Sequence, residues 1–142
     1  MRVLRIAVFL AMAALVVQYI TGLITNIYAP ASGYTSGSVF APYVDHFVTG
    51  IVLGILAIAV LVLCIRVRDR DFVVLATVAL ASIVLAGVFG MAFIHTSPNE
   101  PIYSVGMGIA FLAAFFAGGT LAGLVNRRFV GGRARPPTPV VP

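Results

Sequence analysis

The chain has 142 residues, of which 61% are hydrophobic and only 9% are charged, and its formal net charge is +5. Soluble domains carry about 25% charged residues, so this composition excludes a water-soluble globule and predicts a protein that lies mostly in lipid. All nine basic residues are arginines placed beside apolar runs. They are therefore interpreted as membrane-topology signals and not as a nucleic-acid-binding face.

Four apolar runs follow one another along the chain. Each has about the 20 residues that a helix needs to cross the hydrocarbon of a bilayer. They cover about residues 3–27, 44–65, 72–95 and 102–125. We predict an all-α integral membrane protein, with four transmembrane helices in one antiparallel up-down bundle over residues 1–126. The basic, proline-rich segment 127–142 is predicted to be a flexible tail.

The first run has a second interpretation, as a cleaved signal peptide, because "MRVLR" resembles a charged leader. Its apolar stretch continues past the usual length of about 7–15 residues. We therefore expect it to be a retained transmembrane helix.

The arginines fall into three segments, at residues 2–5, 66–70 and 127–135. The other two connections between apolar runs contain no arginine or lysine. If the chain crosses four times, all the arginines lie on one side. The positive-inside rule then predicts cytoplasmic termini and a multi-pass protein of the cell (plasma) membrane.

Two further predictions concern packing. Cys64 is the only cysteine and lies within an apolar run, so we expect it to be a small buried packing residue. Gly119 and Gly123 are spaced four residues apart in the last run, as in the close-packing seams of membrane helices. We interpret them as a seam.

Polar residues gather in the halves of the runs away from the arginines. Gln18, Thr21 and Thr25 share one face of the first predicted helix by their spacing. Asp45 and His46 stand at the start of the second run, and His95 ends the third. Polar groups inside a membrane are costly, so each is a candidate for a functional site.

His46, Gly50 and Gly54 recur at steps of four and form one stripe. An imidazole with glycines below it suits a haem, because the ring nitrogen can bind iron while the glycines leave room for the macrocycle. Other interpretations stay open. Glycines at this spacing also form packing seams, and His46 or His95 could be interfacial polar residues. Asp45 could orient His46 or be a solvated residue at a helix start.

Three sequence stretches carry a family resemblance: "VVQYITGLITNIYAP", then "DHFVTGIVLG" after a small-residue loop, then "LAGVFGMAFI". Together they resemble one half of the heme A synthases, membrane proteins built from two related four-helix bundles that each carry a histidine pair. The resemblance covers most of residues 10–125. It implies that His46 is an axial ligand of haem b, and that Gln18 and Gly22 belong to the helix-one pattern.

The family's second histidine lies early in helix four, where this chain reads "YSVGMGIAF". His95, at the end of the neighbouring helix, could substitute as a second iron ligand; otherwise the haem would be five-coordinate, bound by a dimer, or absent. The expected cofactor-binding set is His46, His95, Gly50, Gly54, Gln18 and Asp45.

The resemblance implies an oxidoreductase that oxidises a methyl group of heme O for the assembly of a terminal oxidase. Its partners would be the lipid bilayer, heme O as substrate, and respiratory oxidase subunits or further copies of the chain. The alternative is a small non-catalytic accessory subunit of a respiratory membrane complex, whose glycine seams pack against partner helices.

Overall fold

The structure, a computed structural model, describes residues 1–28, 37–95 and 101–131, with side chains described over 1–25, 44–93 and 102–130. Four helices make up this part of the chain: α1 (Arg2–Tyr28), α2 (Gly37–Val67), α3 (Arg70–His95) and α4 (Pro101–Gly131). Each contains a segment long and apolar enough to cross a membrane. The prediction of an all-helical chain with four helices long and apolar enough to span a membrane is thereby confirmed.

All four helices extend past the apolar runs, and α2 and α4 extend furthest. The helix α2 begins at Gly37, within a segment expected to be loop, and α4 continues to Gly131, into the expected tail. Hydropathy identifies only the part of a helix that matches hydrocarbon, whereas backbone hydrogen bonding can continue beyond it. At the end of α4, Arg128 forms an ion pair with Asp69 and lies over the ring of Phe72, 4.8 Å from its centre.

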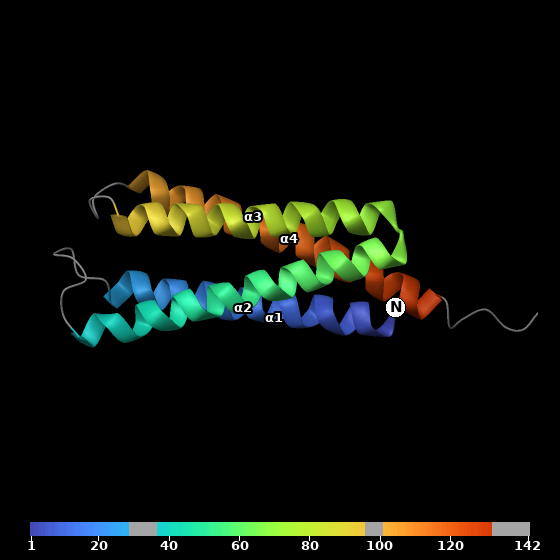
Figure 1. Ribbon diagram of the computed structural model, residues 1–142, viewed down its shortest axis with the longest axis horizontal. Helices are drawn as coiled ribbons and strands as arrows, with labels where there is room; N and C mark the ends of the chain where they lie inside the picture. Colours follow the sequence, from blue (N-terminus) through green and yellow to red (C-terminus); the bar gives the residue numbers. More distant parts are fainter. Residues whose placement is uncertain (29–36, 96–100, 132–142) are drawn as a thin grey trace, which may run out of the picture.

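The contacts of α1 with α2, α2 with α3, α3 with α4 and α4 with α1 close a ring of four helices. Each contacts two neighbours, and the most extensive contacts are those of α1 with α2 and of α3 with α4. Figure 1 shows the N-terminus, the α2–α3 turn and the end of α4 at one end of the bundle. We call this the turn end. The end of α1 and the start of α2 lie together at the opposite end, where the polar residues gather.

The turn between α2 and α3 is short and has defined caps. Arg68 has a φ of 58°, in the left-handed region, and its N–H donates to the carbonyl of Ile65 over 3.1 Å. The carboxylate of Asp69 accepts from the N–H of Asp71 at 3.1 Å and of Phe72 at 3.4 Å. Asp69 is therefore the N-cap of α3 and satisfies donors that the helix itself leaves free.

The larger cluster of buried side chains lies at the turn end and draws on all four helices. Its members are Leu4, Val8, Val60, Cys64, Phe72, Ala76, Leu121 and Val125. The predicted burial of Cys64 is thereby confirmed. A smaller cluster of Leu15, Leu53 and Ala114 follows further along the bundle. The segments 16–25 of α1 and 44–52 of α2 lie toward the end of the bundle opposite the turn end. Thr25 is the one buried side chain described in them.

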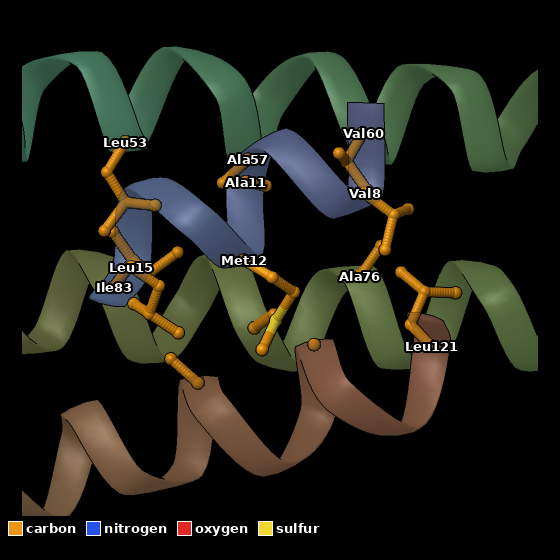
Figure 2. Close-up of a pocket in the computed structure, with 13 residues that line it drawn as sticks. Val8, Ala11, Met12, Leu15, Leu53, Ala57, Val60, Ala76, Ile83 and Leu121 are labelled. Carbon is orange, nitrogen blue, oxygen red and sulfur yellow. The ribbon is translucent and has the colours of Figure 1, made fainter. Parts of the chain in front are cut away.

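A cavity of about 30 Å³ lies between the four helices in the middle of the bundle. Figure 2 shows Met12, Leu15, Leu53 and Ile83 pointing toward it. The volume would hold one water molecule, but the apolar walls offer no hydrogen-bond partners, so we expect the cavity to be dry. Pockets for organic ligands measure about 300–1,000 Å³. We interpret this small apolar cavity as a packing defect in the core.

Candidate functional site

The polar residues of α1 and α2 meet along one face of each helix. Helical spacing places Gln18 and Thr21 of α1 on the same face as Gly22, as the sequence predicted. It likewise places His46 and Thr49 of α2 on the same face as Gly50. These faces contact one another directly. We call this contact the polar seam, and its members are Gln18, Thr21, Gly22, His46, Thr49 and Gly50.

Large and small residues alternate reciprocally across the polar seam. A β-carbon placed on Gly22 would lie 2.9 Å from Cε1 of His46, so the imidazole occupies the space above this glycine. A β-carbon on Gly50 would lie 3.2 Å from Nε2 of Gln18, so the amide occupies the space above that one. Each helix thus supplies a long polar side chain and, one turn later, the glycine that receives its partner.

Hydrogen bonds connect these side chains across the two helices. The amide nitrogen of Gln18 lies 3.2 Å from Nδ1 and 3.3 Å from Nε2 of His46. The Thr21 hydroxyl lies 3.2 Å from Nδ1 of His46. The Thr49 hydroxyl donates to Oε1 of Gln18 over 2.5 Å, which turns the amide nitrogen toward the imidazole.

One proton assignment satisfies this network. The Thr21 hydroxyl donates to the backbone carbonyl of Gln18 over 3.1 Å, so toward His46 it acts as an acceptor. Nδ1 of His46 then carries the proton and donates to Thr21, while Nε2 accepts from the Gln18 amide. This is the neutral imidazole, which has one donor and one acceptor. Its hydrogen-bonding capacity is met within the polar seam.

The arrangement described for these side chains does not fit a haem. Binding of iron through Nε2 of His46 would require the amide of Gln18 to move away. Gly50 receives that same amide, so its free side is not available to a macrocycle. The cavity in the described core is about a tenth of the volume of the smaller ligand pockets, and no histidine lines it.

The other predicted site residues lie apart from this network. No atom lies within 4 Å of a β-carbon built on Gly54. Asp45 is exposed, and its backbone carbonyl oxygen lies 2.9 Å from the hydroxyl oxygen of Thr49. His95 is the last residue of α3, and its side chain lies outside the described part of the chain.

Sequence reasoning missed Thr49 and the receiving role of Gly22. The signal was present, because Thr49 follows His46 by three residues and so lies on the same face. The pair Gln18 and Gly22 also repeats the spacing of His46 and Gly50. A search for matching large-and-glycine pairs on consecutive helices would have found the polar seam.

The prediction that Gly119 and Gly123 form a seam within the bundle is wrong. Apart from the neighbouring backbone of α4 itself, no atom of the described residues lies within 4 Å of a β-carbon built on either glycine. Close approaches of α4 use other glycines: Gly106 receives the ring of Phe89, with a β-carbon distance of 2.9 Å, and Gly118 receives the sulfur of Met12. The four-residue spacing of Gly119 and Gly123 therefore does not show which face of α4 is packed. The packed face is the one that carries the buried side chains of α4.

No protein-family profile, curated protein or solved structure matches this chain, so its site is interpreted from its own residues and geometry.

Proposed function

We propose that this chain is a small non-catalytic subunit of a membrane complex, and that the polar seam serves to join α1 to α2. The observation that carries the proposal is the engagement of His46, whose two ring nitrogens both lie within 3.3 Å of polar atoms on α1. Hydrogen bonds between membrane helices contribute about 0.6 kcal/mol each on average. A network of several such bonds, together with complementary packing, would stabilise the association of α1 with α2 and so explain why polar residues lie in this part of the chain.

The outer surface of the bundle supports association with other chains. Gly87, Gly119 and Gly123 are exposed and have open space where a β-carbon would lie. In a bilayer, small residues on an open face allow a second helix to approach closely. A respiratory complex is the setting we propose, on the strength of the sequence resemblance to heme A synthases.

The state of assembly tests this part of the proposal. Membranes that contain the tagged chain would be solubilised in a mild detergent and separated on a native gel. We expect the chain to migrate well above the size of its 14.9 kDa monomer, together with respiratory subunits identified by mass spectrometry. Migration as a free monomer at all detergent concentrations would contradict the proposal.

We also propose an antiparallel up-down path through the plasma membrane with cytoplasmic termini. The support is the gathering of the described arginines at the turn end. Cysteines introduced at Ser36 and Ala134 in a Cys64→Ser background can be treated with an impermeant thiol reagent in intact cells. We expect labelling at position 36 only. Labelling at 134 and not at 36 would reverse the orientation.

Haem binding by His46 is the competing function. It would require the polar seam to open. Thr25 is the one buried side chain in the described segments 16–25 and 44–52 of α1 and α2, so few buried contacts there oppose such an opening. A reduced-minus-oxidised spectrum of protein expressed with excess haem separates the two functions. We expect no haem bands. Stoichiometric haem that is lost in His46→Gln and retained in the control Asp45→Asn would establish the competing function.

A further inference from the structure

The turn end of the bundle carries an excess of exposed positive charge. The start of α1, the α2–α3 turn and the end of α4 all contribute to it (Figure 1). We call this the arginine surface, and its members are the exposed residues Arg2, Arg66, Arg68, Arg70 and Arg127.

Two further arginines at this end are used in internal contacts. The guanidinium of Arg5 lies 4.7 Å from the centre of the Phe129 ring. Arg128 pairs with Asp69, approaches Asp71 at 3.9 Å and lies over Phe72. The two aspartates of the turn are thus directed to Arg128, and no ion pair joins the arginine surface to any described acidic residue.

Arg68 is held at the tip of the turn at a local cost. Its φ of 58° lies in the left-handed region, which glycine adopts freely and which is sterically unfavourable for a residue with a β-carbon. Arg66, next to the last residue of α2, and Arg70, the first residue of α3, lie two residues to either side of it in the sequence. A long cationic side chain therefore stands where backbone geometry alone favours glycine.

We propose that the arginine surface binds the phosphate groups of anionic phospholipids. The five guanidinium groups border the ends of the apolar spans, which is the depth at which headgroups lie. Guanidinium binds phosphate oxygens through two parallel hydrogen bonds, so the partner's chemistry complements this surface in charge and in geometry. The proposal does not depend on the function of the polar seam.

The full chain in a neutral detergent provides the test. It would be titrated with dioleoyl-phosphatidylglycerol or, in parallel, with dioleoyl-phosphatidylcholine, and the apparent Kd taken from the rise in thermal midpoint. We expect a saturable rise with phosphatidylglycerol only. Each arginine near a membrane surface contributes about a fivefold effect. The triple variant Arg66→Gln, Arg68→Gln and Arg70→Gln should raise the apparent Kd by more than about tenfold.

Two single variants separate charge from folding. Arg68→Gly removes a charge and relieves the backbone, so it should keep or raise the lipid-free midpoint while weakening phosphatidylglycerol binding by about fivefold. Arg128→Gln also removes one positive charge, but from the internal ion pair with Asp69. It should lower the lipid-free midpoint and leave the lipid affinity within about twofold.

Three outcomes would overturn the proposal. An equal response to both lipids would show general solvation by detergent and lipid. Unchanged affinity in the triple variant would place binding elsewhere. Suppression of the phosphatidylglycerol effect by millimolar inorganic phosphate at constant ionic strength would identify a site for free anions instead of headgroups.

Discussion

The imidazole of His46 lies against Gly22, so close that a β-carbon on this glycine would be 2.9 Å from Cε1 of the ring. Side chains essentially never approach one another so closely, so the position requires glycine for as long as the ring stays in place. The ring is held there by its hydrogen bonds to α1. His46 and Gly22 therefore depend on each other, and each can be used to test the position of the other.

Gly22→Ala should destabilise the protein by about 1–2 kcal/mol, because the added methyl group overpacks the polar seam. Gly54→Ala is the matched control, since it adds the same group to open space and removes a glycine from a helix. The free energy of unfolding, measured by titration with sodium dodecyl sulfate in mixed micelles, would show the difference. We expect little or no loss in the control.

Removal of the imidazole of His46 should relieve its clash with the methyl group of Gly22→Ala. We expect the destabilisation caused by Gly22→Ala to be smaller in a His46→Ala background than in the wild-type chain. Equal destabilisation in both backgrounds would mean that the methyl group meets something other than the imidazole.

A double-mutant cycle between Gln18 and His46 tests the hydrogen bonds. The single variants Gln18→Ala and His46→Ala and their combination should give a coupling energy of about 0.5–1.5 kcal/mol, in the range of interhelical bonds in membranes. Unfolding in mixed micelles again supplies the free energies. Additive effects, with no coupling, would contradict the proposed network.

Thr77 supplies a control for this cycle. Its hydroxyl donates to the carbonyl of Val73 on its own helix, over 2.8 Å, and it is exposed. A cycle between Gln18 and Thr77→Ala should therefore show no coupling. A coupling here equal to that of Gln18 with His46 would point to a general effect of these substitutions.

The helices were predictable because their apolar runs are long and the arginines mark their ends. Cys64 was predictable for a related reason, because a small apolar residue inside such a run is usually packed. The face of each helix was less accessible. Lipid and protein interior are both apolar, so hydropathy does not distinguish the exposed Gly119 from the packed Gly118.

The partner of His46 was the least predictable feature of the site. The stripe of His46, Gly50 and Gly54 suits a cofactor or a second helix equally well by spacing alone. In the structure the opposing surface is that of α1, where Gln18 and Gly22 have a shape complementary to His46 and Gly50. Which face of α1 meets which face of α2 depends on how each helix is rotated about its own axis. The sequence of a single helix does not determine that rotation.

Asp69 should matter more as a helix cap than as an ion-pair partner. Asp69→Ala removes both roles and should cost about 1–2 kcal/mol, whereas Asp69→Asn keeps a capping oxygen and should cost less than about 1 kcal/mol. The Asp69 side chain is 12% exposed and the Arg128 side chain is 50% exposed, so solvent screens part of the attraction between them. Thermal unfolding would rank the variants.

Asp71→Ala is the control for the cap. Its carboxylate is 71% exposed and lies 3.9 Å from Arg128, so we expect a change within about 0.5 kcal/mol. A loss in Asp69→Asn as large as in Asp69→Ala, and abolished by high salt, would show instead that the ion pair dominates.

The two faces of α4 should respond in opposite ways to the same substitution. Gly106→Leu places a side chain against the ring of Phe89, where even a β-carbon would lie 2.9 Å away, so the purified chain should lose thermal stability. Gly119→Leu enters open space and should leave that stability unchanged. In native membranes, however, Gly119→Leu should dissociate the chain from a partner helix seated on this face. Loss of stability of the purified monomer in Gly119→Leu would contradict the outward placement of this residue, and an undisturbed complex would assign the face to lipid.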